Sequence, residues 1–221
     1  MADSLNGFYA SKEAGYFDSV RKEILPLLPE DMARVLEVGC GSGGTLEWLK
    51  REKGCSWIAG IELSEESGRI AGERLDFFVL GNVEQMDLPF PSGSVDLVLC
   101  LDVLEHLVDP WAAVRRLCVL LRPGGFLIAS LPNICHRSAI IPLLFRDRWD
   151  YQPSGILDRT HLRFFTRKTS VELLEQNGFA VDMVMPVVPV ARGSKTWFLN
   201  LITFGLFRRF LTTQYLIRAK R

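Results

Sequence analysis

The stretch "LEVGCGSGG", residues 36–44, places four glycines directly after an apolar run. Residues 35–38 predict a strand, and residues 45–53 predict a helix that begins at the glycines. Glycine permits a sharp turn and lets a ligand approach the main chain, and a helix start supplies unpaired N–H donors. In open α/β sheets, ligands bind at the carboxyl ends of strands. The stretch therefore predicts a small-molecule binding loop rather than a plain turn.

Apolar runs and helix-like stretches alternate through the next ninety residues. Further strands are predicted at 57–62, 77–80, 95–100 and 126–131, with helices at 64–75 and 112–121 and a turn at 122–125. Continuous apolar strands separated by helices indicate a parallel sheet covered on both faces.

The pattern changes after residue 133. Residues 133–166 are irregular, rich in aromatic residues and arginine, and contain Pro142. Regularity returns with a helix at 168–177, ended by Gly178. Strands are then predicted at 179–188 and 214–219, as an antiparallel pair at the sheet edge.

The composition is that of a globular protein of one domain, or one domain with an elaboration. The chain has 221 residues, 48% of them hydrophobic, and a formal net charge of +0. Up to Asn133 there are 12 Lys and Arg against 20 Asp and Glu, and after it 14 against 6. This asymmetry fits either a division of labour between the two parts or chance surface composition.

Cysteine usage and the N-terminus favour a cytoplasmic protein. The five cysteines are scattered and form no C-x-x-C pair, which fits a reducing compartment. Residues 1–4 show no start of a signal peptide, and no uninterrupted apolar segment reaches the ~20 residues that span a bilayer. The nearest candidate, 197–211, contains Asn200 and two adjacent arginines.

The glycine pattern and two acids narrow the ligand. Gly39, Gly41 and Gly44 match G-x-G-x-x-G, and Glu62 ends the next strand, where a carboxylate can accept hydrogen bonds from ribose hydroxyls. Nicotinamide and adenosyl cofactors both satisfy this much. Glu37, just before the turn, suits pyrophosphate poorly and suits a cationic ligand such as a sulfonium or an ammonium.

Four stretches together carry a family resemblance: "VLEVGCGSGG", "GIELS", "GNVEQMDLPFPSGSVDLVLCLDVLEHLVDP" and "LRPGGFLIASLPN". In this order they resemble the class I S-adenosylmethionine-dependent methyltransferases, over residues 16–133. Through "DRTHLRFFT" the resemblance extends to a subgroup that acts on small molecules and cell-surface sugars. It implies a doubly wound, Rossmann-like α/β fold. The expected sheet has seven mostly parallel strands in the order 3-2-1-4-5-7-6, with one antiparallel edge strand.

The resemblance also implies which residues bind S-adenosylmethionine. The positions concerned are Glu37, Gly39, Gly41, Glu62, Leu63, Asn82, Val83, Leu101 and Asp102. The glycines would pass along the methionine moiety, Glu37 would support the loop and the amino group, and Glu62 would hold the ribose diol. Leu63 would lie against the adenine.

The other four positions lie after the third and fourth strands. Asn82 and Val83 match the position that reads the adenine edge, where many relatives carry Asp instead of Asn82. Leu101 would offer its main-chain carbonyl near the methionine amine. Asp102 lies just beyond, at the mouth of the site.

Methyl transfer needs alignment more than acid or base catalysis. Alignment supplies up to ~7–11 kcal/mol, and a base is needed only if the acceptor must lose a proton. His106 is the leading base candidate and His161 the second, although either could be structural. His136 is a weaker candidate. The three histidines are far apart in sequence and show no metal-binding spacing, so no metal site is expected.

Residues 134–167 are expected to build the acceptor pocket. Their aromatic residues could stack on a sugar, and their arginines could bind a phosphate or carboxylate. An anionic or lipid-linked small molecule would suit them, although the arginines could instead form salt bridges to the acidic first part. Residues 197–211 could lie on a membrane surface, cover an apolar acceptor or cover the sheet. The composition argues against a nucleic-acid partner and indicates no particular oligomeric state.

The chain divides into four expected parts: a helical cap at 1–33, the cofactor-binding core at 34–133, the acceptor segment at 134–167, and helices and edge strands at 168–221. The cap would contain a helix at 11–28, with Tyr16 near the methionine carboxylate. The expected function is methyl transfer to a small molecule, with oxygen as the favoured acceptor atom. The alternatives are a nicotinamide-dependent oxidoreductase and a non-catalytic scaffold that keeps the cofactor pocket.

Overall fold

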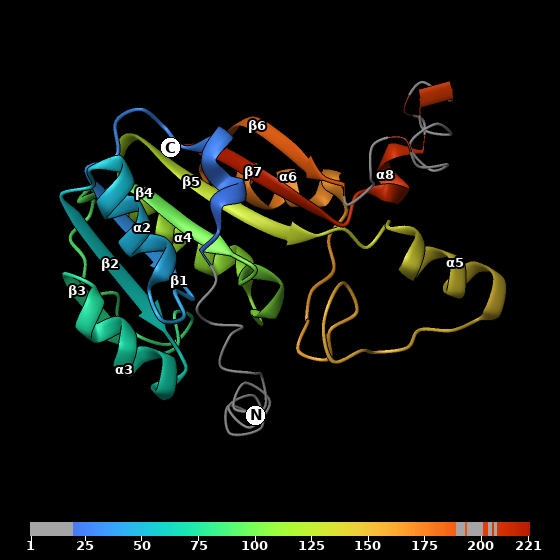
Figure 1. Cartoon of the computed structure of the whole chain (residues 1–221), viewed down its shortest axis with the longest axis horizontal. Coiled ribbons are helices and arrows are strands. Elements are labelled where there is room, and N and C mark those ends of the chain that lie inside the picture. The colour runs from blue at the N-terminus through green and yellow to red at the C-terminus, as the bar shows by residue number, and fades with distance from the viewer. Residues whose placement is uncertain (1–19, 189–192, 194–200, 203–204, 206) are drawn as a thin grey trace.

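A seven-stranded sheet in the order β3-β2-β1-β4-β5-β7-β6 forms the centre of the molecule (Figure 1). The computed structural model describes residues 20–188, 193, 201–202, 205 and 207–221. The strands are β1 (Arg34–Val38), β2 (Trp57–Glu62), β3 (Phe77–Leu80), β4 (Val95–Leu101), β5 (Leu121–Pro132), β6 (Ala180–Val187) and β7 (Gln214–Lys220). The helices are η2 (Lys22–Leu27), α2 (Gly44–Lys53), α3 (Glu65–Arg74), η3 (Leu104–His106), α4 (Pro110–Leu120), α5 (Arg137–Arg146), α6 (Arg167–Glu175) and α8 (Arg208–Leu211).

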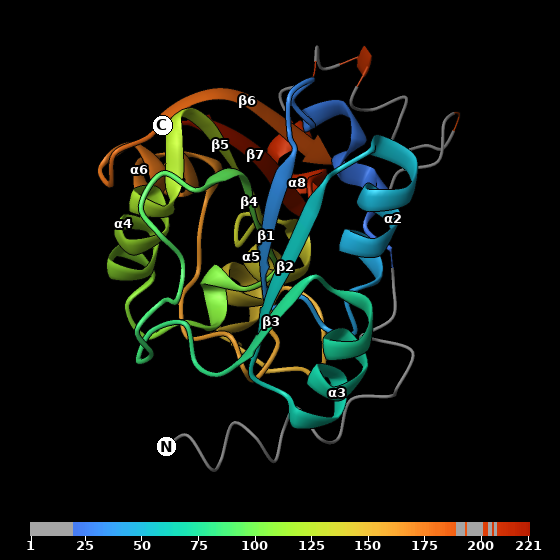
Figure 2. The same ribbon diagram turned by 90° about the vertical axis from the view of Figure 1, so that its left-hand side faces the viewer.

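Helices cover both faces of the sheet, and each face has its own core. Figure 2 shows α2 and α3 on one face and α4 and α6 on the other. Leu46 and Leu49 of α2 pack in one cluster of buried residues, and Leu117 and Leu173 pack in the other. The central strands are buried on both sides, which explains why their sequences are continuously apolar rather than alternating.

The parallel strands bring their carboxyl ends to one edge of the sheet. β1 pairs in parallel with β2 and β4, and β4 with β5. β7 is antiparallel to both of its neighbours, β5 and β6. The predicted strand order, and the antiparallel pair formed by the last two strands of the chain, are confirmed.

The turn predicted at residues 122–125 lies inside β5 as a bulge. Val95 pairs with Leu121 and Leu97 pairs with Phe126, so the residues between Leu121 and Phe126 face Asp96 alone. Gly124 adopts φ +79°, which explains the glycine at this point. The expectation of a plain turn was wrong because pairing with β4 continues on both sides of the glycines.

The expectation that residues 133–166 are wholly irregular was also wrong. α5 forms within them, although Pro142 lies inside it. Its N-cap is His136, whose side chain accepts a hydrogen bond from the Ser138 amide. A proline costs a helix one hydrogen bond and usually ends it, so the sequence pattern hid this element.

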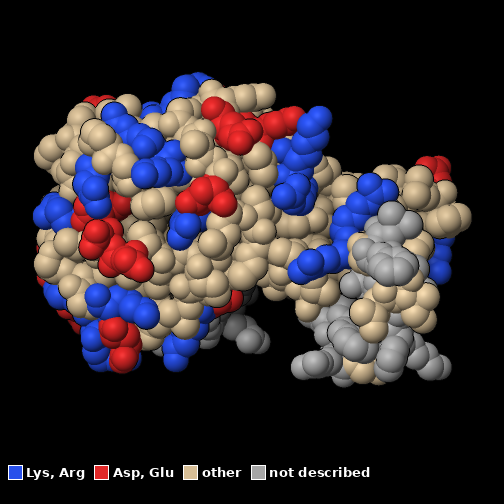
Figure 3. Space-filling model, turned by 90° about the horizontal axis from the view of Figure 1, so that it is seen from above, with Lys and Arg blue, Asp and Glu red and all other residues tan. Residues whose placement is uncertain are grey.

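Residues 11–19 of the predicted helix at 11–28, with Tyr16 among them, lie outside the described residues, and the predicted segment at 197–211 is described only at 201–202, 205 and 207–211. What is described of the first is the short 3-10 helix η2. The five cysteines are free thiols. In the described portion, no helix has the length and apolarity that crossing a bilayer requires. Figure 3 shows acidic and basic side chains intermingled over the larger lobe of the face that it presents.

Candidate active site at the carboxyl ends of β1, β2 and β4

The glycine loop turns tightly between β1 and α2 and packs against the end of β4. Gly39, Gly41 and Gly43 all have positive φ, which L side chains adopt only with strain. The Gly39 and Cys40 amides donate to the Ile61 carbonyl at 2.8 and 3.2 Å, which joins the loop to β2. A Cβ atom at Gly39 would lie 2.6 Å from Val103 Cγ2. The loop therefore packs closely against the segment that follows β4.

Glu62, at the end of β2, holds the loop and the next helix start with its carboxylate. One oxygen accepts from the Gly41 amide at 2.8 Å, and the other from the Leu63 and Ser64 amides at 2.8 and 2.9 Å. A carboxylate has about four acceptor sites. With three of these sites used, Glu62 can still accept a hydrogen bond from a diol while it fixes the shape of the loop.

Glu37, in β1, is a buried acid with one carboxylate oxygen that lacks a hydrogen-bond partner in the described part of the chain. Its side chain is 3% exposed, and Oε2 has no hydrogen-bond partner within the described residues. Burial, opposed by Arg21 and reinforced by Glu62, raises the pKa of Glu37 to about 8. A buried carboxylate oxygen without a hydrogen-bond partner costs stability unless a cation arrives. Its position at the glycine loop fits a positively charged ligand.

Asp102 is the centre of a polar cluster that the sequence did not reveal. It has φ +59°, unusual for a residue other than glycine. Its carboxylate accepts from Arg21 Nη1 at 2.7 Å, from Ser130 Oγ at 2.7 Å and from the Gln214 amide. Arg21, Ser130 and Gln214 come from three different segments, and only folding brings them together.

Arg21 adds a cation beside the glycine loop. Its main-chain amide lies 3.2 Å from Thr45 Oγ1, in the first turn of α2. Burial opposes the charge, but the carboxylates of Asp102 and Glu23 outweigh this effect and hold the pKa of Arg21 above its ordinary value. A fixed cation next to Glu37 can pair with the carboxylate of an amino-acid ligand.

The remaining sequence-predicted positions lie around the same edge. Leu101 is buried at the end of β4 and Leu63 is half-buried after β2. Asn82 and Val83 follow β3, where Asn82 Oδ1 accepts from the Glu84 amide at 2.9 Å. The Val83 carbonyl accepts from Arg116 of α4 at 2.7 Å, which fixes this loop.

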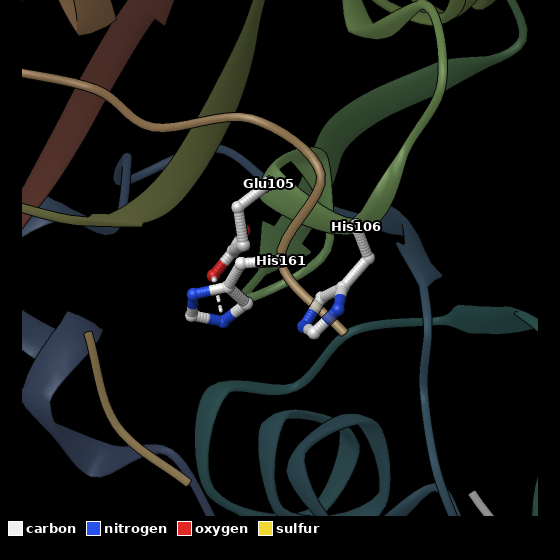
Figure 4. A group of neighbouring side chains, drawn as sticks. All are labelled: Glu105, His106 and His161. Atoms are coloured by element: carbon white, nitrogen blue, oxygen red, sulfur yellow. Dashed lines mark ion pairs between the residues drawn. The ribbon is translucent and has the colours of Figure 1, made fainter. Parts of the chain in front are cut away.

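Glu105, His106 and His161 form one group although their positions differ by up to 56 residues in sequence (Figure 4). The two rings have centroids 4.7 Å apart, and His161 Nε2 lies 4.0 Å from Glu105 Oε1. Main-chain bonds from the Leu162 and Arg163 amides to the Glu105 carbonyl, at 2.9 and 3.0 Å, bring the two segments together. Both predicted catalytic histidines thus meet directly beyond Asp102.

Residues 134–167 supply aromatic side chains next to this group. Trp149 and Phe164 have ring centroids 5.2 Å apart, and Phe164 lies 6.5 Å from the His161 ring. Arg148 pairs with Asp150 of its own segment, and Arg163 donates to the Val108 carbonyl at 3.1 Å.

Comparison with known proteins gives the family. A family model described as "Methyltransferase domain" matches residues 9–184. The ubiquinone biosynthesis O-methyltransferase of Cupriavidus pinatubonensis is 28% identical over 173 residues, which cover 72% of this chain and 68% of that protein. The 27-O-demethylrifamycin SV methyltransferase of Amycolatopsis mediterranei is 34% identical over 108 residues, which cover 46% of this chain and 39% of that protein.

A solved structure shows the same fold. The S-adenosylmethionine-dependent methyltransferase of Mesorhizobium loti superposes with a TM-score of 0.65 at 20% identity, over 93% of this chain and 100% of that one. Because the family model covers most of the chain, the chain belongs to the methyltransferase family. It is a class I S-adenosylmethionine-dependent methyltransferase, and S-adenosylmethionine is its methyl donor.

Proposed function

We propose that the chain transfers the methyl group of S-adenosylmethionine to an oxygen atom of a small molecule. The observation that carries this proposal is the buried carboxylate of Glu37 at the glycine loop, whose Oε2 has no hydrogen-bond partner within the described residues. The donor's ammonium and sulfonium are the cations that such a group would attract.

The cofactor would extend from Glu37 to the loop after β3. Glu37 and the Leu101 carbonyl would hold the ammonium, Arg21 the methionine carboxylate, and Gly39 and Gly41 would line the chain of the methionine. Glu62 would hold the ribose diol.

The adenine would lie beyond the ribose. Leu63 would pack against its face, while Asn82 and Val83 would meet its edge. Asp102 would orient the Arg21 side chain and would not bind the donor directly. Its carboxylate already accepts hydrogen bonds from three protein groups.

The reaction forms one C–O bond and breaks one C–S bond. The acceptor oxygen attacks the methyl carbon, the C–S electron pair stays on sulfur, and S-adenosylhomocysteine leaves. The hydroxyl proton leaves to the solvent or to a base during the step. His106 and His161 would be the groups that meet this hydroxyl, since they lie beyond Asp102 and beside Glu105.

The acceptor would be anionic or lipid-linked. α5 exposes four apolar side chains, namely Ile141, Leu143, Leu144 and Phe145, and the last two are 68% and 80% exposed. Exposed arginines lie at both ends of the helix, at 137 and 146. Figure 1 shows α5 projecting away from the sheet. An apolar surface flanked by arginines suits an anionic lipid surface on which such an acceptor would be held.

The proposal is tested with purified protein and a panel of hydroxylated acceptors, including quinols and lipid-linked sugars, by measuring formation of S-adenosylhomocysteine. We expect turnover with at least one class, and we expect Arg21→Met to weaken binding of the donor about tenfold or more. Arg51→Met is the matched control, because Arg51 is an exposed arginine that also pairs with an acid. Binding of the donor without turnover on any acceptor would favour the scaffold alternative.

A further inference from the structure

We propose that Glu105, His106 and His161 bind one divalent transition-metal ion at the acceptor end of the site. Each residue offers one ligand atom, and the three atoms lie within 4.8 Å of one another (Figure 4). Two imidazoles and one carboxylate are a ligand set that proteins use for Zn²⁺ and for Fe²⁺, with further positions left for a substrate.

The histidine tautomers are fixed as a metal site needs them. His106 Nδ1 lies 3.1 Å from the Thr160 carbonyl, and His161 Nδ1 lies 3.0 Å from the Ile156 carbonyl. A carbonyl accepts only, so Nδ1 carries a hydrogen in both rings, and in the neutral form of each ring Nε2 has a lone pair for an ion. Metal-binding histidines show the same arrangement, in which a carbonyl orients the ring through its other nitrogen.

The turn that carries the Thr160 carbonyl and His161 is held by hydrogen bonds to Asp158. The Thr160 amide and hydroxyl both donate to Asp158 Oδ1, at 2.8 and 2.7 Å, and the His161 amide donates to the Asp158 carbonyl at 3.0 Å. This tight turn is buried. The segment therefore presents His161 in one orientation before any ion arrives, which lowers the cost of binding.

Glu105 supplies a second, independent observation. Its side chain is 1% exposed, and neither carboxylate oxygen has a hydrogen-bond partner in the described part of the chain. A buried carboxylate without hydrogen-bond partners is costly, even with His161 Nε2 at 4.0 Å. A cation held between this carboxylate and the two imidazoles would satisfy it.

Two imidazoles in the set favour a borderline ion over Mg²⁺ or Ca²⁺, which prefer oxygen ligands. The role of the ion in catalysis rests on the proposed function: an acceptor hydroxyl bound to it would become more acidic. Binding of the ion does not depend on that function, so it can be tested alone.

The test measures Zn²⁺ and Co²⁺ binding to the full chain after treatment with a chelator, by titration calorimetry and by the visible spectrum of the Co²⁺ form. We expect one ion per chain. His106→Asn and His161→Asn keep a donor for the carbonyl but lose Nε2, and Glu105→Gln keeps the shape but loses the charge. Each should weaken binding about a hundredfold or more, because each removes a direct ligand.

The matched control is His136→Asn, because His136 lies at the start of α5 and outside the group. We expect its ion binding to be unchanged. Circular dichroism and urea unfolding show whether each variant is folded. If Glu105→Gln does not fold, the ion binding of the two histidine variants tests the proposal. The proposal is overturned if the wild type binds no stoichiometric ion, if the ligand variants bind as tightly as the wild type, or if His136→Asn abolishes binding.

Failure of this proposal is separable from failure of the proposed function. Ion binding is measured without donor or acceptor, and donor binding is measured without the ion. A chain that binds the donor and methylates an acceptor but binds no ion would overturn the metal site alone.

Discussion

The charge on Glu37 should control binding of the methyl donor. Its pKa is raised to about 8 by burial, so the acid is neutral in the empty site at lower pH and must lose its proton when the ammonium binds. Affinity for S-adenosylmethionine should therefore rise with pH toward 8, up to about tenfold per unit. Calorimetry in buffers of different ionisation enthalpy would measure the affinity and the released proton.

Glu37→Gln is the variant that tests this reading. It should weaken donor binding about 10- to 100-fold at pH 8, the value of one charge-assisted hydrogen bond of about 1.5–3 kcal/mol. It should also remove the rise in affinity below pH 8. A variant that binds with the same pH dependence as the wild type would show that another group titrates.

The same acid should affect the stability of the empty protein. Between an unfolded pKa of about 4.3 and the folded value of about 8, Glu37 is protonated when folded and ionised when unfolded. The unfolded state then binds fewer protons, so stability falls as pH rises through this window. Urea unfolding should show that Glu37→Gln gains stability relative to wild type from pH 5 to pH 8.

Glu62 should be needed for both the loop and the ribose. In Glu62→Gln the amide nitrogen would face either the Gly41 amide or the Leu63 and Ser64 amides, which are all donors. We expect a loss of about 1–3 kcal/mol in the free energy of unfolding. Donor binding should weaken about tenfold or more. Glu47→Gln, at an exposed acid in α2, is the control and should change neither quantity.

Many of the residues of the candidate site can be predicted from the sequence. Glu37, the glycines and Glu62 lie in two short motifs, and adjacency in parallel strands guarantees that they meet. Arg21, Ser130 and Gln214 carry no local signal, because each is an ordinary polar residue until the fold places it against Asp102. His106 and His161 are far apart in sequence, which argued against a metal site. In the folded chain their ligand atoms and that of Glu105 lie within 4.8 Å of one another, so the sequence separation is no argument against one.

At the scale of elements, the glycine loop should be intolerant of side chains where it meets the end of β4. Gly39 and Gly54 have similar backbone angles, φ +68° and +72°, but only Gly39 has a close neighbour, Val103 Cγ2. Gly54→Ala should cost about 1–2 kcal/mol from backbone strain alone. Gly39→Ala should cost about 1–3 kcal/mol more, because the methyl group overpacks the contact.

Combining Gly39→Ala with Val103→Ala separates the two causes. The second change removes the overlapping methyl group, so the double variant should recover part of the stability and of the donor binding, as measured by urea unfolding and calorimetry. Full additivity of the two losses would mean that the contact is not the cause.

The elements that the sequence did not predict have identifiable physical reasons. The bulge in β5 is hidden because Pro123 and two glycines usually end a strand, yet here β4 pairs on both sides of them. α5 is hidden by Pro142 and by its apolar residues, which leave Ala139 as its single buried residue and so show no clear amphipathic face. The regular core was predictable because its strands are buried on both faces.

At the scale of the whole molecule, α5 should mediate binding of the protein to membranes that contain anionic lipid. Wild-type protein should float with vesicles that contain an anionic lipid and should be released by salt, since screening shortens the reach of arginine charges to about 8 Å at physiological ionic strength. The double variant Leu144→Ser with Phe145→Ser should lose most of this binding.

The control replaces two exposed apolar residues elsewhere, Val108→Ser with Val119→Ser. Its vesicle binding should match the wild type, and activity on a soluble acceptor should be retained by both double variants. Wild-type protein that remains unbound in low salt would remove the support for a lipid-linked acceptor.

β7 follows β6 in the chain but lies between β5 and β6 in the sheet. During synthesis, β6 therefore emerges before β7, the strand that pairs with both β6 and β5. The hydrogen-bonding edge of β5 stays unpaired until β7 emerges. β7 also delivers Gln214 to Asp102, the cluster beside the donor pocket. A nascent chain that has reached only β6 would thus be prone to aggregate through the β5 edge and would lack the Gln214 contact to Asp102. A chaperone that shields the β5 edge would act at this stage.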